Sequence, residues 1–303
     1  MRSDQTIDLG FTKIPITVYK GAKPGPVLAL TAGIHGYEYP PILALQRLQV
    51  KKLAGTLIVV HVANMPSFLG RTVYFSPLDG KNLNRVFPGR KDGTASEQIA
   101  HAITTQVIDK CDYLLDLHCG DGNESLRPYV YQTVTGDPVF DKRIEELVAN
   151  FGFDHIVIDR ARPKDPTASM YCSNTAITRG KPAMTVEAGF LGATDEKSTR
   201  AIIAGVESVM RYLKMIDGKP NKKKPVYLDP AAVLNSPATG ILYPHVEPNA
   251  MVKKGAVLAH ITDFFGKKIA EVKAPFAGLI LYVVATPPIT EGQPVACVGR
   301  IRR

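Results

Sequence analysis

The sequence predicts an α/β fold: a mixed, largely parallel sheet with helices on both faces, followed by a small all-β domain. Three observations predict it. From about residue 14 to residue 216, short β-rich runs alternate with longer helical patterns. The runs at 27–33 and 56–64 are apolar almost throughout, as is typical of strands covered on both faces. Beyond residue 218 the strands are short, separated by Pro and Gly, and show no helical period.

The elements of the first part each carry a local signal. The segment EYPPILALQRLQ (38–49) predicts a crossover helix with its prolines in the first turn, where missing N–H groups do little harm. The segment 94–110 predicts an amphipathic helix with Thr94 or Ser96 as its N-cap. The run YLLDLH (113–118) predicts a strand that ends in polar residues.

Two more strands and a long helix complete this part of the chain. The runs FDHIVIDR (153–160) and AMTVEAG (183–189) predict strands, and the segment 194–215 predicts an amphipathic helix. The segment IDGKPNKKKP (216–225) is rich in Gly, Pro and Lys. This change of composition predicts a linker between two domains.

We therefore expect a first domain at residues 1–218 and an all-β domain at residues 219–303. The second contains an internal repeat, because SPATGILY (236–243) recurs as APFAGLILY (274–282). The repeat predicts a small pseudo-twofold β-sandwich and resembles the biotinyl/lipoyl domain, which is built from two such halves. The lysine triplet of carrier domains is absent, so we expect this domain to cap or line the site rather than to carry a prosthetic group.

Composition and charge exclude several classes of protein. The 303 residues are 45% hydrophobic and 21% charged, unlike disordered or fibrous chains. No apolar run reaches the roughly 18 residues of a membrane span and the N-terminus lacks a signal-peptide core, so we expect a cytoplasmic protein without a membrane partner. The four cysteines include no CxxC pair.

The net charge of +9 favours a small anionic substrate. It does not indicate nucleic acid, because the densest basic run, 219–224, lies in the predicted linker. The sequence leaves open whether the chain forms a homo-oligomer.

A candidate metal site follows from two predicted strand ends. GIHGYE (33–38) lies where the first buried strand turns into its helix, so His35 and Glu38 can converge on one ion above flexible glycines. His118 ends another buried strand, and parallel strands end at the same edge. Catalytic zinc takes three protein ligands, so we predict one zinc per chain on His35, Glu38 and His118. Asp116 is the predicted partner that orients an imidazole.

Other residues supply groups that hydrolysis needs. Glu187 ends a third apolar strand, where we predict a general base that takes a proton from water and returns it to the leaving amine. Asn84 and Arg85, in the polar loop 79–89, are candidates for binding a substrate carboxylate, since a guanidinium can bond both of its oxygens. Arg71 is a candidate for binding the substrate and polarising the scissile carbonyl.

The motifs GIHGYE, NLNRVFPG, DLHCG and TVEAG together resemble those of the succinylglutamate desuccinylase/aspartoacylase family, within the zinc carboxypeptidase clan. The resemblance covers about residues 14–215 and extends to the β-rich tail. It implies a zinc carboxypeptidase-like fold, the three zinc ligands given above, and Glu187 as base and then acid. It also implies Asn84 and Arg85 as ligands of the amino acid α-carboxylate. Arg71 is a looser match, because it lies 14 residues before Arg85.

The resemblance implies a zinc-dependent amidohydrolase, a deacylase that cleaves the linear amide bond of a small N-acyl amino acid. A zinc carboxypeptidase acting on short peptides stays open, because it would use the same zinc and the same carboxylate contact. A non-catalytic binding or carrier protein is the alternative of another class.

The sequence does not identify the acyl group or the amino acid. An acidic substrate needs a second cationic contact, for which Arg160, Arg162 and Arg179 are candidates. Acetylated diaminobutyrate is another substrate to consider.

Overall fold

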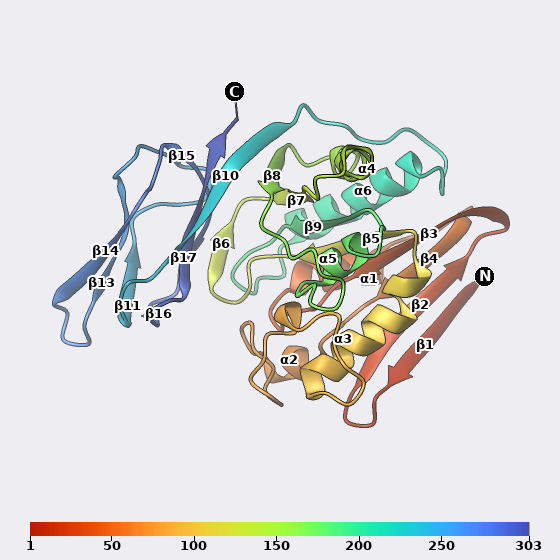
Figure 1. The fold of residues 1–303 in the computed structure, drawn as a ribbon, viewed down its shortest axis with the longest axis horizontal. Helices are drawn as coiled ribbons and strands as arrows, with labels where there is room; N and C mark the ends of the chain where they lie inside the picture. The colour runs from red at the N-terminus through yellow and green to blue at the C-terminus, as the bar shows by residue number, and fades with distance from the viewer. Residues whose placement is uncertain (303) are drawn as a thin grey trace.

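The computed structural model describes residues 1–302. Most of its strands belong to one sheet of 13 strands (Figure 1). Its strands lie in the order β1, β2, β4, β3, β5, β9, β7, β8, β10, β17, β15 and β12, and β6 pairs with β15. They are β1 (Arg2–Asp8), β2 (Lys13–Lys20), β3 (Lys23–Thr31), β4 (Ala54–Val60), β5 (Tyr113–His118), β6 (Glu124–Leu126), β7 (Tyr129–Thr133), β8 (His155–Asp159), β9 (Ala183–Glu187), β10 (Val226–Asn235), β12 (Met251–Val252), β15 (Gly278–Val284) and β17 (Pro294–Ile301).

The centre of this sheet is largely parallel, which confirms the mixed α/β architecture predicted for the first part of the chain. Strands β4, β3, β5 and β9 are parallel neighbours. Strands β7, β8 and β10 form a second parallel set, joined to the first by the antiparallel pair of β7 and β9. Because β3, β5 and β9 are parallel, their carboxyl ends meet at one edge of the sheet.

Six α-helices accompany the sheet in the described residues. They are α1 (Tyr39–Arg47), α2 (Met65–Gly70), α3 (Ala95–Gln106), α4 (Pro138–Ala149), α5 (Cys172–Ile177) and α6 (Glu196–Tyr212), with short 3₁₀ turns η1 (Leu83–Arg85) and η2 (Ile108–Lys110). Helix α1 packs against α6, and α3 packs against α5. Pro40 and Pro41 lie in the first turn of α1, and Thr94 is the N-cap of α3, as predicted.

The main core lies between the sheet and these helices. Leu28 and Leu30 of β3 and Leu114 and Leu115 of β5 are fully buried, together with Ile202 of α6. These near-continuous apolar strands are the ones the sequence identifies as covered on both faces. The burial fixes the register of the neighbouring strands and so the positions of the residues at their carboxyl ends.

Several elements carry no clear sequence signal. Strand β1 is a polar edge strand whose seven side chains are exposed except Ile7, so it shows no apolar period. Helix α5 has the sequence CSNTAI and all of its residues are buried. Its polar side chains are bonded inside the protein, as Ser173 Oγ is to Thr185 Oγ1 (2.8 Å), so no amphipathic stripe marks it.

The tail of the chain contains a second sheet of four strands. These are β14 (Lys268–Lys273), β13 (Val257–Thr262), β11 (Gly240–Pro244) and β16 (Pro288–Ile289), in that order. A separate apolar core joins the two sheets of the tail through Leu258 and Ile261 on β13 and Ile280 and Val283 on β15. The two copies of the repeat fall on β11 and β15, in different sheets.

The tail is also continuous with the central sheet. Strand β10 pairs with β8, and β15 pairs with β6, which follows the predicted His118 strand. Figure 1 shows the tail strands, in blue, at the end of the molecule opposite β1. The division at residue 218 and the resemblance to a biotinyl/lipoyl domain stay predictions.

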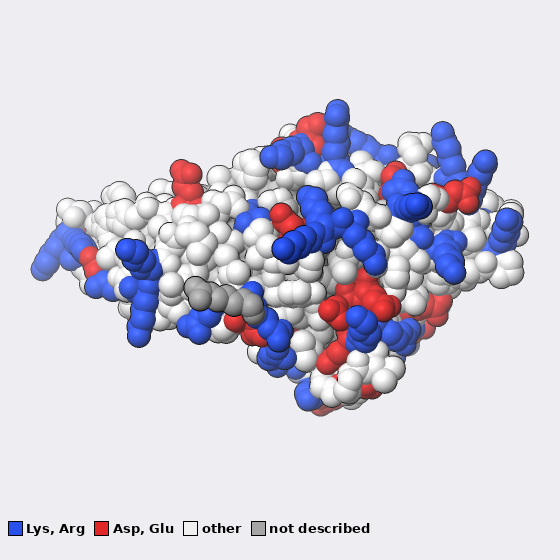
Figure 2. All heavy atoms as spheres, turned by 90° about the horizontal axis from the view of Figure 1, so that it is seen from above, with Lys and Arg blue, Asp and Glu red and all other residues white. Residues whose placement is uncertain are grey.

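The surface carries many cations. Lys and Arg side chains are scattered over the face in Figure 2, and Asp and Glu side chains interrupt them.

Among the helices of residues 1–302, none combines the length and the apolar character that a membrane span requires.

Candidate metal centre and catalytic site

The turn after β3 places His35 and Glu38. Gly33 adopts a positive φ of +69°, which favours glycine, and starts the turn. A Cβ at Gly36 would lie 2.3 Å from the carbonyl oxygen of Ser67 and 2.5 Å from that of Thr72. The turn therefore packs directly on the backbone that follows β4, and only glycine allows this close approach.

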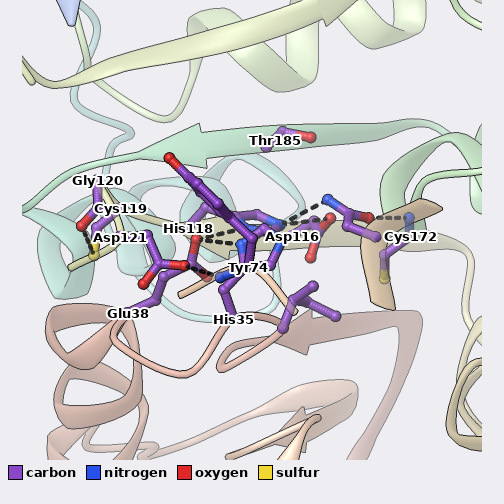
Figure 3. Close-up of polar contacts among 12 residues, drawn as sticks. His35, Glu38, Tyr74, Asp116, His118, Cys119, Gly120, Asp121, Cys172 and Thr185 are labelled. Atoms are coloured by element: carbon purple, nitrogen blue, oxygen red, sulfur yellow. Dashed lines mark hydrogen bonds and ion pairs between the residues drawn. The ribbon is translucent and has the colours of Figure 1, made fainter. Parts of the chain in front are cut away.

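Three side chains from two strand ends meet above this turn (Figure 3). His35 Nδ1 lies 2.8 Å from Glu38 Oε1, and His118 Nδ1 lies 3.1 Å from the same oxygen. One ligand atom from each of the three residues lies within 4.8 Å of the others, and all three are buried. The structure thus brings together the residues that the sequence predicts as metal ligands.

The donor set fits a divalent metal ion. Glu38 Oε2 is buried and has no hydrogen-bond partner in the described residues, so it is free to act as a ligand. Burial alone would raise the pKa of Glu38, but His118 and His35 outweigh it and lower this pKa to about 2. Two imidazoles and one carboxylate are a donor set of catalytic zinc sites.

Each imidazole has an outer partner that fixes its orientation. Asn82 Oδ1 lies 3.2 Å from His35 Nε2, a contact that the sequence did not predict. Asp116 Oδ2 lies 3.1 Å from His118 Nε2, an ion-pair contact, as expected for this residue. The hydroxyl of Thr31 donates to Asp116 Oδ1 at 2.7 Å and holds the carboxylate in place. Such outer partners keep the other ring nitrogen directed at a metal.

Glu187 lies beside this group at the end of β9. It is the register partner of His118, on the neighbouring parallel strand, and it lines the same cavity. Burial raises the pKa of Glu187 well above its ordinary value, and nearby Glu38 adds to this effect against His118. A carboxyl group with a raised pKa is suited to accept a proton and give it back.

The loop before α3 places Asn84 and Arg85 at the cavity. Asn84 is buried, its Oδ1 accepts the N–H of Cys172 at 2.8 Å, and its Nδ2 lies 3.5 Å from His118 Nε2. The Arg85 guanidinium donates to the Asn84 carbonyl at 2.8 Å and lies 4.7 Å from the ring centre of Tyr171. Both residues line the cavity, where they can contact a bound molecule.

Arg71 does not reach this site in the structure. It is the exposed left-handed C-cap of α2 (φ +49°), and it is not among the described residues that line the cavity. The chain turns there, and Tyr74 faces the cavity instead, with its ring 5.9 Å from that of His35 (Figure 3). The contact of Arg71 with a scissile carbonyl therefore stays a prediction, and the position of Arg71 outside the cavity lining does not support it. The sequence did not predict Tyr74, because a tyrosine in a loop carries no motif.

The cavity has a volume of about 760 Å³ and two walls from distant parts of the chain. His35, Glu38, His118 and Glu187 form one wall, and residues of the tail form another. The tail residues in the lining include Val233, Tyr282 and Cys297. The tail therefore lines the site, as predicted from the sequence.

The three arginines considered for a second carboxylate lie in ion pairs. Arg160 lies 2.9 Å from Asp229, and Arg162 pairs with Asp159 at 2.5 Å. Arg179 lies 3.0 Å from Asp109 and donates to the carbonyl of Thr175 in α5 at 3.2 Å, and it is not part of the cavity lining.

Comparison with known proteins adds to this geometry. A sequence profile described as the succinylglutamate desuccinylase/aspartoacylase catalytic domain matches residues 24–213. The chain is 32% identical to the N-alpha-acetyl-L-2,4-diaminobutyric acid deacetylase of Halomonas elongata, across 96% of this chain and 87% of that protein.

Solved structures share the whole fold. The product-bound ectoine utilization protein EutE (DoeB) from Ruegeria pomeroyi matches with a TM-score of 0.85 and 27% identity, over 98% of this chain and 93% of that one. A succinylglutamate desuccinylase/aspartoacylase from Rhodobacter sphaeroides matches with a TM-score of 0.84 and 23% identity, over 99% and 96% of the two chains. Both matches include the tail.

Proposed function

The chain belongs to the succinylglutamate desuccinylase/aspartoacylase family, and from this premise we propose that it is a zinc-dependent deacylase of small N-acyl amino acids. It hydrolyses the linear amide bond to give a carboxylic acid and a free amino acid. The observation that carries this proposal is the carboxylate of Glu38 between two imidazoles, beside Glu187, inside one cavity. The name of the Halomonas relative supports an acetyl group on the α-nitrogen.

We assign one zinc ion per chain to His35, Glu38 and His118. Zinc supplies, when bound, a Lewis acid that makes water more acidic and polarises an amide carbonyl. Asn82 and Asp116 orient the two histidine rings through their outer nitrogens. We assign these roles from the ligand atoms that the side chains offer and from the distances between those atoms.

Glu187 is the proposed general base and acid. Its carboxylate accepts a proton from the attacking water and then donates it to the amine as the C–N bond breaks. Its position at the end of β9, beside His118, puts this proton transfer next to the metal ligands. The amine therefore leaves in a neutral form rather than as an anion.

Arg85 is the proposed contact for the substrate α-carboxylate, with Asn84 beside it. A guanidinium can make two parallel charge-assisted hydrogen bonds to a carboxylate, which fixes the orientation of the substrate. The Tyr171 ring and the Asn84 carbonyl already hold the guanidinium in place. The scissile amide of a bound N-acyl amino acid is only one carbon from this carboxylate.

The test combines metal analysis with an amine-release screen. We expect about one zinc per chain, and release of amino acid from N-acetyl, N-succinyl or N-formyl amino acids but not from short peptides. Glu187→Gln should keep zinc and fold, and kcat should fall about 10²- to 10⁴-fold. Release from peptides alone would assign the chain to the carboxypeptidases, and a zinc-free protein without hydrolysis would contradict the proposal.

A further inference from the structure

Glu124 is a carboxylate in the cavity that the proposed reaction does not use. It begins β6, three residues beyond Asp121, and lines the same cavity as His35 and Glu187. The tail fixes its position, because Glu124 is the register partner of Val284 on β15. The N–H of Leu191 donates to the Glu124 carbonyl at 2.9 Å, so the backbone is held from both sides.

The charge of Glu124 is not balanced by a cation of the protein. Its side chain accepts a hydrogen bond from the Tyr74 hydroxyl, a neutral donor. No Lys, Arg or His of residues 1–302 lies within ion-pair distance of it (4.0 Å). Burial raises the pKa of Glu124 to about 7, and Asp121 and Glu38 add to this effect against the Tyr74 hydrogen bond and His35. A buried carboxylate without a counter-charge is costly, and a cationic ligand group would remove that cost.

The other charges of the cavity are already paired or assigned. Arg160 pairs with Asp229, and Arg162 pairs with Asp159. Because these two arginines already have carboxylate partners, they are poor partners for a second substrate carboxylate. Arg85 has no carboxylate partner among residues 1–302. Apart from the metal ligands and Glu187, the described lining thus offers one guanidinium and one carboxylate that take part in no ion pair of residues 1–302.

We propose that Glu124 binds a side-chain ammonium of the substrate, so that the enzyme selects N-acyl amino acids with a cationic side chain. Arg85 binds the α-carboxylate and Glu124 binds the cation, which together match a substrate carrying both charges. Tyr74 is a positioning residue, since its hydroxyl holds the Glu124 carboxylate. This inference rests on the proposed deacylase function.

The test compares three substrates of similar size and different side-chain charge. These are N-alpha-acetyl-L-2,4-diaminobutyrate, its neutral isostere N-acetyl-L-norvaline, and N-acetyl-L-glutamate. We expect the highest kcat/KM for the cationic substrate. In Glu124→Gln the ratio of kcat/KM between the cationic and the norvaline substrate should fall about 10- to 100-fold. Glu124→Asp, which keeps the charge, should retain more of this ratio than the glutamine variant.

Controls separate the possible failures. Glu271→Gln removes a half-buried carboxylate on β14 that is not part of the cavity lining, and should keep the wild-type ratio. Circular dichroism and zinc content show whether each variant is folded. A wild-type preference for norvaline or glutamate, or an equal loss on all substrates in Glu124→Gln, would overturn the role of Glu124 and leave the deacylase proposal standing. Failure to hydrolyse any N-acyl amino acid would instead refute the proposed function.

Discussion

The guanidinium of Arg85 lines the cavity and takes part in no ion pair of the described residues. A substrate carboxylate can therefore bind it without breaking such a pair. The orientation of the guanidinium comes from the Asn84 carbonyl and the Tyr171 ring. A guanidinium held in this way loses little freedom when it binds a carboxylate, and lysine cannot reproduce its two parallel bonds. Substrate affinity should therefore depend on Arg85 more than the chemical step does.

Arg85→Ala should raise KM for N-acyl amino acids about 10- to 100-fold, with a smaller change in kcat, because the lost contact is present before and during the reaction. Arg85→Lys should recover only part of the loss. Steady-state kinetics checks this, with Arg200→Ala as the control, since Arg200 is an exposed residue of α6. An unchanged KM in Arg85→Ala would show that another group binds the carboxylate.

At the scale of the elements, the turn between β3 and α1 decides whether the metal ligands meet. His35 and Glu38 are both on this short turn, and its position depends on the close contact of Gly36 with the carbonyl oxygens of Ser67 and Thr72. A side chain at position 36 would push the turn away from the backbone after β4. The distance between His35 and His118 would then change as well.

Gly36→Ala should therefore weaken zinc binding and lower the free energy of unfolding by about 1–3 kcal/mol, as steric strain at a packed turn does. Gly70→Ala is the matched control, because the three atoms nearest to its added Cβ are side-chain atoms, the first of them Pro77 Cγ at 3.3 Å. Zinc titration and urea unfolding measure the two effects. Equal zinc affinity in the wild type and Gly36→Ala would show that the turn can move without displacing its ligands.

The start of α3 carries a pH-dependent contact. Glu97 accepts the backbone N–H of Thr94 at 2.7 Å, and this bond lowers the pKa of Glu97 to about 2, against the opposing effect of burial and with help from Arg90. The folded pKa lies below the unfolded one. The contact therefore contributes stability above the unfolded pKa, and the contribution is lost as pH falls toward 2.

Glu97→Gln should lower the free energy of unfolding at pH 7 by about 1 kcal/mol, the usual worth of a helix cap. The difference from the wild type should shrink as the pH is lowered from 5 to 3, because Glu97 of the unfolded chain becomes protonated over this range while Glu97 of the folded chain stays largely charged. Urea unfolding across this range is the measurement. A difference that stays constant with pH would mean that charge does not contribute to the cap.

At the scale of the whole molecule, one sheet connects the N-terminal strands, the metal ligands and the tail. Strand β10 extends the central sheet through β8, and β15 holds β6, the strand of Glu124. The cavity is therefore a property of the complete chain rather than of the first 218 residues. Ligands bound in it should stabilise all of these parts together.

Zinc should raise the melting temperature of the whole chain as one transition, because the unfolded chain lacks the assembled site. Free zinc at 1,000 times its Kd should raise the free energy of unfolding by about 4 kcal/mol. For a chain of this size, this corresponds to a rise in melting temperature of roughly 5–10 °C. Calorimetry with and without a chelator measures it. His118→Ala should show little zinc dependence, and two separate transitions would contradict a tail that is integral to the fold.

The sequence alone determined much of this protein. Strong apolar runs gave the buried strands β3, β4, β5 and β9, because burial on both faces leaves few polar positions. The motifs then placed His35, Glu38 and His118 at strand ends, where parallel pairing had to bring them together. Polar elements such as β1 and the buried helix α5 gave no comparable signal.

The tertiary structure alone decided which other groups share the cavity. Arg71 carries the right chemistry and lies outside, whereas Tyr74 and Asn82 carry no motif and contact the histidines. Glu124 faces the cavity because β15 pairs with β6, a contact between segments about 160 residues apart in the chain. A sequence pattern records local period and spacing, and such long-range contacts depend on how the whole chain packs.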